Sequence, residues 1–211
     1  MPARLKLHDR GWATEFDDRG LAQGSVGRRL GVQAIMSNVD MLDDISRVEG
    51  GDAGAVDIGL IGEAQTGQLF SIFADIVARG EGFPQQPPLT RPVFDDVWVR
   101  PVTLVVGATR QGQLVGAYYL KPNLPGIGSH IANAGYVVDR RYRGLGIGRL
   151  LVEDSISRAP LAGFDAIQFN FVFADNPARA LYEGLGWQVV GNVPDGIAPG
   201  RDAVIYWRAV P

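Results

Sequence analysis

The sequence predicts an α/β fold, a mixed and mostly antiparallel twisted sheet with helices on both faces. Strand-like and helix-like segments alternate through the middle of the chain, and pairs of strand-like segments occur at both ends of this part. The 211 residues, 46% of them hydrophobic, are enough for one domain with a sizeable core. We expect this domain to span residues 52–211. Residues 1–51, with a short amphipathic run from Val39 to Ile45, are expected to form an N-terminal extension of unclear structure.

The first elements of the domain follow from periodicity and from helix-breaking residues. Val56 to Ile61 is a predicted strand, and Ala64 to Ala78 is a predicted helix with apolar residues at helical spacing. Residues 80–88 contain three prolines and two glycines, so they must form a loop. Phe94 to Val99 is predicted as a short helix or a turn.

The second half of the chain continues with strands and two helices. Val102 to Val106 and Leu114 to Leu120 are predicted strands joined by a turn at Arg110 to Gly112. Ile131 to Val138 is the next strand, and it leads into a helix that ends near Arg158 because Pro160 cannot continue it. The remaining predicted elements are a strand from Phe164 to Phe173, a helix that begins at Asn176, a strand near Val189 and a strand from Ala203 to Arg208.

The segment from Arg143 to Gly148 says most about function. It lies between a predicted strand and a predicted helix, and its three glycines at alternate positions let the backbone approach a ligand closely. The first turn of a helix has unpaired N–H groups and a dipole that favours an anion. Four arginines add positive charge around the loop: Arg140, Arg141, Arg143 and Arg149. A phosphate-bearing ligand is therefore predicted here.

The spacing within this loop excludes two common phosphate motifs. A dinucleotide fingerprint needs a glycine where the chain has Arg149, and a P-loop needs a G-K-[ST] ending that is missing. The remaining pattern, R-x-x-G-x-G, resembles the acyl-CoA motif of the GCN5-related N-acetyltransferase (GNAT) superfamily. The resemblance implies a GNAT-like fold, acetyl-CoA as co-substrate and an oxyanion donor in the backbone N–H near Val138. The implied cofactor-binding residues are Val137, Val138, Arg143, Gly144, Leu145, Gly146, Ile147, Gly148, Arg149 and Asn176.

A second segment, Asn176 to Trp187, supports this interpretation. Its apolar residues fall on one face of a short helix, with Asn176 as N-cap, Pro177 at the first helical position and Gly186 as the stop. The alternative is a plain capped helix with Tyr182 in the core. The segment resembles the N…A-x-x-L-Y-x-x-x-G-[FW] segment of GNAT enzymes, in which the tyrosine usually serves as general acid.

Three further segments resemble one branch of the superfamily more closely. They are Gly116 to Asn123, Ser129 to Tyr136 and Phe169 to Phe173. They look like the L-azetidine-2-carboxylate acetyltransferases, which N-acetylate small proline-like amino acids. In that branch a tyrosine at the position of Tyr182 is not always kept. The resemblance implies that Asn133, Asn170 and Asn176 line the catalytic site, so the catalytic candidates are Asn133, Asn170, Asn176 and Tyr182.

The residues themselves favour substrate roles for Asn133 and Asn170. Each amide interrupts an apolar strand, where burying it is costly unless it is hydrogen-bonded. An amide offers a donor and an acceptor, which suits a ligand with an amine and a carboxylate. The alternative is that each amide bonds a neighbouring backbone group. Strand alternation puts His130 on the opposite face from Asn133, and we expect His130 to be structural.

Composition excludes several other classes. A net charge of -3 without a basic run argues against nucleic acid as a partner. Cysteine is absent, and His8 and His130 have no metal-site spacing, so no metal is expected. No apolar run approaches the ~20 residues of a membrane span, and the first residues lack a signal-peptide core. We therefore expect a cytoplasmic protein that does not bind membranes. A homodimer is compatible with the sequence.

The expected function is acetyl-CoA-dependent transfer of an acetyl group to the amine of a small amino acid, such as a proline analogue like azetidine-2-carboxylate. One alternative is a GNAT enzyme for another amine, namely a protein N-terminus, a polyamine or an aminoglycoside. A polyamine or an aminoglycoside would call for an acidic cleft, whereas the expected cleft strands carry amides and aromatic residues. Another alternative is an acyl-CoA-binding regulatory module without catalysis.

Overall fold

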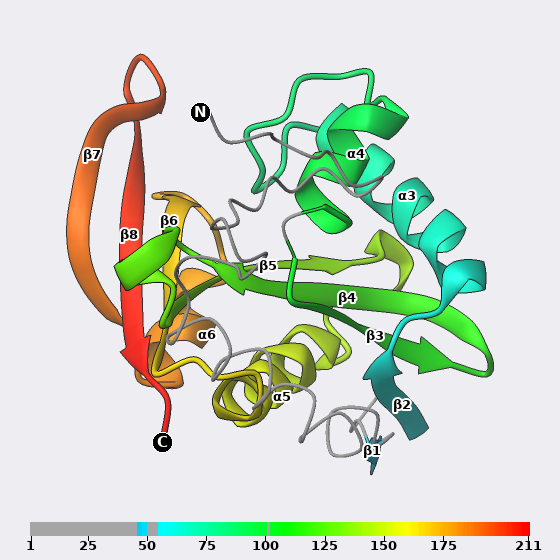
Figure 1. Ribbon diagram of the computed structural model, residues 1–211. Coiled ribbons are helices and arrows are strands. Elements are labelled where there is room, and N and C mark those ends of the chain that lie inside the picture. Colours follow the sequence, from blue (N-terminus) through cyan, green and yellow to red (C-terminus); the bar gives the residue numbers. More distant parts are fainter. Residues whose placement is uncertain (1–45, 50–54, 101) are drawn as a thin grey trace, which may run out of the picture. The chain divides into compact units, whose positions relative to one another are not determined.

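The computed structural model describes residues 46–49, 55–100 and 102–211. The expected amphipathic run from Val39 to Ile45 lies outside these residues. The described strands form one eight-stranded sheet in the order β1-β2-β3-β4-β5-β6-β8-β7 (Figure 1). The strands are β1 (Ser46–Glu49), β2 (Ala55–Leu60), β3 (Leu104–Arg110), β4 (Gln113–Pro122), β5 (Ile131–Val138), β6 (Ala166–Phe173), β7 (Gln188–Ala198) and β8 (Arg201–Ala209).

Helices cover both faces of this sheet (Figure 1). The described helices are α3 (Glu63–Ala78), α4 (Arg91–Trp98), α5 (Ile147–Leu161) and α6 (Arg179–Gly184), with short 3-10 turns η2 (Gly126–Gly128) and η3 (Arg140–Tyr142). One buried cluster joins α5 and α6 to the sheet and includes Tyr118, Leu151 and Phe169. A second cluster joins α3 and α4 to the other face and includes Phe73 and Trp98. The predicted fold class is therefore confirmed.

The register explains where the sheet opens. Every pair of neighbouring strands is antiparallel except β5 and β6, which run parallel. Their paired register covers only Ile131–Asn133 and Ala166–Gln168. Both strands are several residues longer than this paired part, and their remaining residues are not hydrogen-bonded to each other. The second halves of two central strands are thus left to line a space in the middle of the sheet.

Several expected boundaries differ from the structure by a few residues, and those of α5 and α6 have a clear physical reason. Helix α5 does not end before Pro160 but includes it and ends at Leu161. A proline in the last turn removes only one late hydrogen bond, and the turn is closed by Ala162 N–H on Arg158 O (3.0 Å) and Gly163 N–H on Pro160 O (3.0 Å).

The other boundary is the start of α6. This helix begins at Arg179 and not at Asn176, because the side chain of Asn176 accepts the Ala178 N–H (2.9 Å) and holds a turn before the helix. Gly186 follows the helix with φ +87°, so its expected role as the stop is confirmed.

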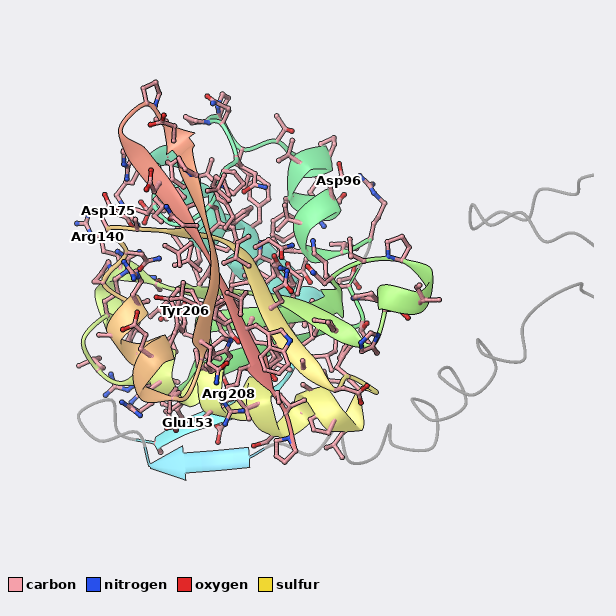
Figure 2. All side chains as sticks on the ribbon, turned by 90° about the vertical axis from the view of Figure 1, so that its left-hand side faces the viewer. Asp96, Arg140, Glu153, Asp175, Tyr206 and Arg208 are labelled. Atoms are coloured by element: carbon pink, nitrogen blue, oxygen red, sulfur yellow. The ribbon has the colours of Figure 1, made fainter. Side chains whose placement is uncertain are left out.

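Helix α6 is fixed to the sheet by hydrogen bonds between one tyrosine of β8 and two residues of the helix. Tyr206 is a fully buried residue of β8 (Figure 2). Its hydroxyl accepts a hydrogen bond from Arg179 Nε (2.8 Å) and donates one to Glu183 Oε1 (2.6 Å). Both partners belong to α6, one turn apart, so the contact fixes the rotation of the helix about its axis. This rotation turns Tyr182 toward the gap between β5 and β6.

Candidate active site

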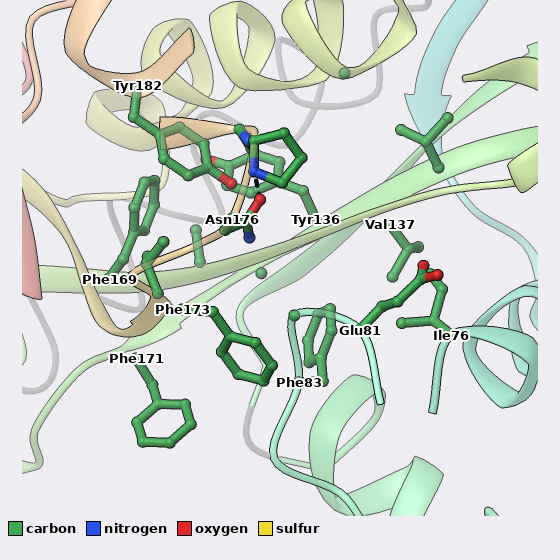
Figure 3. A pocket seen from close by; sticks show the side chains of 18 of the residues that line it. Ile76, Glu81, Phe83, Tyr136, Val137, Phe169, Phe171, Phe173, Asn176 and Tyr182 are labelled. Carbon is green, nitrogen blue, oxygen red and sulfur yellow. Dashed lines mark hydrogen bonds between the residues drawn. The ribbon is translucent and has the colours of Figure 1, made fainter. Parts of the chain in front are cut away.

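A cavity of about 950 Å³ occupies this gap. Its walls come from residues 76–85 at the end of α3 and in the loop after it, 133–138 of β5, 146–148 at the start of α5 and 169–173 of β6. Figure 3 shows Tyr182 and Asn176 on one wall, with Glu81 and Phe83 of the loop on the opposite wall. The size suits a ligand larger than a single amino acid.

Backbone groups of β5 face the cavity. Asp139 N–H donates to Val115 O of the β4 side (2.9 Å), so the N–H groups of odd-numbered residues at this end of β5 point toward β4. Alternation along the strand turns the N–H groups of Tyr136 and Val138 the other way, toward the side where β6 no longer pairs. Both residues line the cavity. Val138 N–H is therefore available to an acceptor atom of a ligand.

The glycine-rich loop forms one end of the cavity. Gly144 and Gly146 have φ +79° and +84°, a conformation that favours glycine. Gly146 is the N-cap of α5, and no side chain caps this helix. A Cβ atom at Gly144 or Gly146 would meet no atom within 4 Å, so the space above the loop is open. The unpaired N–H groups of the first turn face an open surface, which fits a pyrophosphate.

Most of the expected cofactor-binding residues line the cavity. Those that do are Val137, Val138, Arg143, Gly144, Gly146, Ile147, Gly148 and Asn176. Leu145 and Arg149 are not among the lining residues. Leu145 packs against the core, and Arg149 bonds Glu153 (3.2 Å), which lies on the exposed face of α5 (Figure 2).

The arginines around the loop do not act as one positive cluster. Arg140 and Arg141 line a separate hollow, and Arg141 is bonded to Asp139 (2.6 Å). Arg143 lines the main cavity, but its guanidinium bonds Glu81 of the loop after α3 (2.7 Å). Glu81 also accepts from Arg79 (2.7 Å), and hydrogen bonds from Arg79 and Arg143 lower its pKa. Glu81 could not be predicted from the sequence pattern, because its contact with Arg143 joins residues 62 positions apart.

The other end of the cavity is built from polar side chains. Asn133 Oδ1 accepts from the Tyr119 hydroxyl (3.3 Å), and Asn133 Nδ2 donates to Gln168 O (3.1 Å). A Cβ at Gly135 would lie 2.7 Å from the Tyr119 ring, so only glycine lets this ring lie across β5. Asn133 therefore bonds a neighbouring backbone group, as the structural alternative predicts, but this bond uses only part of its amide. One N–H and one lone pair of the amide remain for a ligand.

Asn170 lies on the neighbouring strand and also lines the cavity. Its Nδ2 donates to Asn123 Oδ1 (2.6 Å), and its Oδ1 accepts from Gln168 Nε2 (2.8 Å). The register of β6 against β8 shifts between Phe169 and Val172, so the expected alternation of this strand is broken at Asn170. The side chain of Asn170 is exposed, unlike that of Asn133, which is half-buried.

Tyr182 lies in an aromatic group beside the cavity. It is 9% exposed, and its ring packs against Phe169 (centroids 4.8 Å apart) and Tyr136 (6.4 Å). Burial raises the pKa of Tyr182 to about 12. Its phenol is therefore protonated at neutral pH and can donate a proton. His130 is not among the lining residues, and its Nδ1 lies 2.9 Å from Ile127 O.

The part of the chain that the structure describes contains neither a metal-binding cluster nor a membrane-spanning helix. Within it, no group of three or more His, Cys, Asp or Glu residues is arranged to hold a metal ion. None of the helices that the structure describes is both long and apolar enough to cross a membrane.

The model of the acetyltransferase (GNAT) family matches residues 69–187, which include the glycine-rich loop and most of the cavity wall. Among curated proteins, N-acetyltransferase aca1 of Schizosaccharomyces pombe is 43% identical over 99 residues, covering 44% of this chain and 47% of the relative. Protein SPT10 of Saccharomyces cerevisiae is 33% identical over 95 residues, covering 44% of this chain and 15% of the relative. The matched part thus spans about half of aca1 and less of SPT10.

Solved structures match over a longer part of the chain. A GCN5-related N-acetyltransferase from Kribbella flavida is 31% identical with a TM-score of 0.68, covering 73% of this chain and 97% of that one. A GNAT superfamily phosphinothricin acetyltransferase from Sinorhizobium meliloti, solved in complex with acetyl-CoA, has a TM-score of 0.65 at 17% identity, covering 74% of this chain and 88% of that one. The second likeness concerns the fold alone.

Proposed function

Because the chain belongs to the acetyltransferase (GNAT) family, we propose that it transfers an acetyl group from acetyl-CoA to the amine of a small amino acid. One observation carries this proposal. A single cavity joins an open glycine-rich helix start to a polar end with Asn133 and Asn170, and the free edge of β5 runs between them. An anionic cofactor and a small polar acceptor can therefore meet in one cavity.

The cofactor end is expected to act through the backbone. The N–H groups of residues 144–149 would hold the pyrophosphate at the start of α5. Acetyl-CoA, when bound, supplies an activated thioester. Val138 N–H would then donate to the oxygen that becomes negative as the amine attacks, a form of stabilisation that often contributes most to catalysis.

The acceptor end is expected to orient an unprotonated amine. Asn133 and Asn170 each keep hydrogen-bonding capacity for an amine and a carboxylate, and the bonds they already make hold them in place. Asn176 holds the turn before α6 and lines the same cavity. Tyr182 would lie near the sulfur of the cofactor and could protonate it, but we expect it to matter less than the asparagines.

A proline analogue such as azetidine-2-carboxylate is the proposed acceptor. The support is the resemblance of the segments around Asn133 and Asn170 to that branch of the superfamily. The charges in the cavity argue against a polyamine, because the described carboxylates that line it, Glu81 and Asp175, already bond arginines. The proposal assigns this activity to residues 52–211. Strand β1 lies before this boundary and pairs with β2, so residues 46–49 add an edge strand to the same sheet.

A turnover screen tests this proposal. Release of free coenzyme A would be followed with acetyl-CoA and a panel of amines: amino acids, cyclic proline analogues, a polyamine, an aminoglycoside and a peptide with a free N-terminus. We expect the highest kcat/KM for a small cyclic amino acid. Preference for another amine would change the acceptor class. Tight binding of acetyl-CoA without turnover on any amine would favour the regulatory-module alternative.

A further inference from the structure

We infer that Lys121 binds the carboxylate of the acceptor, which makes the substrate of this cavity an amino acid with a free acid group. This inference rests on the proposed function and names a specificity residue for it. Among the residues that the structure describes, the charged side chains that line the cavity are the cations Arg79, Lys121, Arg143 and Arg201 and the carboxylates Glu81 and Asp175.

Three of the four cations already have carboxylate partners. Arg79 and Arg143 both bond Glu81 at 2.7 Å. Arg201 bonds Asp175 at 3.1 Å. Within the parts of the chain that the structure describes, no carboxylate forms an ion pair with Lys121. Its recorded contact is with the ring of Tyr119, whose centroid lies 4.8 Å from Nζ.

The surroundings of Lys121 favour an anion from outside the protein. The residue is half-buried, and loss of solvent around the ammonium lowers its pKa. An ammonium with part of its hydration removed gains from a nearby negative charge, and the described residues form no ion pair with it here. The ring of Tyr119 compensates only part of this loss, since it offers a quadrupole and not a full charge.

Sheet register places Lys121 next to the expected amine-binding group. Lys121 of β4 is paired directly with Asn133 of β5, so both side chains leave the same face of the sheet. Residues paired in this way have Cβ atoms about 5 Å apart. An α-amino acid separates its nitrogen from its carboxylate by one carbon, which suits two such neighbouring groups. Lys121 would take the carboxylate, while the free lone pair of Asn133 Oδ1 would accept from the amine.

The test compares an acid with its amide. Wild type, Lys121→Met and Lys121→Arg would be assayed with azetidine-2-carboxylate and with azetidine-2-carboxamide, which has the same ring and no negative charge. The amide has the more easily deprotonated amine, so a preference for the acid must come from binding. We expect wild type to prefer the acid by at least tenfold in kcat/KM, mainly through KM. Lys121→Met should remove this preference, and Lys121→Arg should keep most of it.

Control measurements separate this inference from general damage. Arg100→Met removes one positive charge from an exposed ion pair with Asp96 outside the cavity, and it should leave the preference for the acid unchanged. An equal loss for acid and amide in Lys121→Met would overturn the inference, as would a wild type without preference for the acid. If Lys121→Met fails to fold, the wild-type comparison still tests the inference, because a wild type without preference for the acid overturns it.

Binding measurements separate this inference from the proposed function. If wild type acetylates no amine, calorimetry with coenzyme A present still tests the anion site. Binding of the acid to wild type and its loss in Lys121→Met would support the carboxylate site while acetyl transfer fails. Equal binding of acid and amide, or no binding of the acid, would contradict it.

Discussion

The two ends of the cavity are built from different parts of the chain. The proposed cofactor end consists of backbone: two glycines with positive φ and the uncapped first turn of α5. The proposed acceptor end consists of side chains, namely Lys121, Asn133 and Asn170, held in place by hydrogen bonds or by sheet register. A backbone site depends on conformation and tolerates many side-chain changes. A side-chain site depends on the identity of each residue, so substitutions at the two ends should have different consequences.

The largest expected effect comes from changing the backbone at the cofactor end. Gly146→Val puts a β-branched residue at φ +84°, where side chains are strained. It also places the side chain in the open space of the cradle, our name for the glycine-rich loop from Arg143 to Gly148 at the start of α5. Acetyl-CoA binding should be lost, as measured by calorimetry. Gly163→Val is the matched control, because Gly163 has φ +85°, equally open space and no place in the cavity wall. Both variants should lose stability, but only Gly146→Val should lose binding. Unchanged affinity of Gly146→Val for acetyl-CoA would contradict the proposal that the cradle binds the pyrophosphate.

The next largest effect is expected at the acceptor end. Asn133→Ala and Asn170→Ala should each lose a charge-assisted hydrogen bond, about 1.5–3 kcal/mol, or roughly ten- to a hundred-fold in kcat/KM. Acetyl-CoA affinity should be unchanged in both. Asn→Asp should be worse at whichever position faces the substrate carboxylate, because like charges would meet.

Stability measurements separate substrate roles from structural roles at these positions. Asn170 is exposed, so its variant should unfold at nearly the wild-type temperature. Asn133→Ala removes one donor to Gln168 O and the recorded acceptor of the Tyr119 hydroxyl, and it should lower the melting temperature somewhat more. Asn192→Ala, on the exposed strand β7, is the control that should leave kinetics unchanged. A large stability loss with normal kinetics would make both amides structural.

A smaller effect is expected at the border between the two ends. Arg143→Ala removes a guanidinium that bonds Glu81 in the free protein. A pyrophosphate would compete with Glu81 for this group, so the net gain from Arg143 is reduced. We expect acetyl-CoA affinity to fall by less than in Gly146→Val, roughly severalfold, as for a partly exposed ion pair. Titration calorimetry with acetyl-CoA measures the affinity of both variants. A larger loss of affinity in Arg143→Ala than in Gly146→Val would mean that the arginine side chain, and not the backbone, dominates cofactor binding.

The same contrast explains what the sequence could predict. The cradle depends on local spacing, and the strand before it was predicted with its observed bounds, Ile131–Val138. The acceptor end depends on register and on long-range contacts. A binding role for Lys121 could not be predicted from the sequence, because it depends on the β4–β5 pairing that places Lys121 opposite Asn133. The expected positive charge around the loop is partly neutralised, because Asp139 bonds Arg141 and Glu81 bonds Arg143. Such partner choices are properties of the folded chain and leave no periodic signal in the sequence.

The smallest kinetic effect is expected from the hydroxyl of Tyr182, a residue that lines the cavity. Tyr182→Phe keeps the ring packed against Phe169 and removes only the proton donor. Because its pKa is raised to about 12, the phenol does not titrate near neutral pH, and the pH profile of kcat should be the same in both proteins there. The raised pKa also means that the protonated phenol stabilises the fold fully below pH ~10, a contribution lost as the pH rises through about 12. We expect kcat to fall by much less than ~10²-fold. A loss of that size or larger, with acetyl-CoA affinity unchanged, would instead make Tyr182 the general acid.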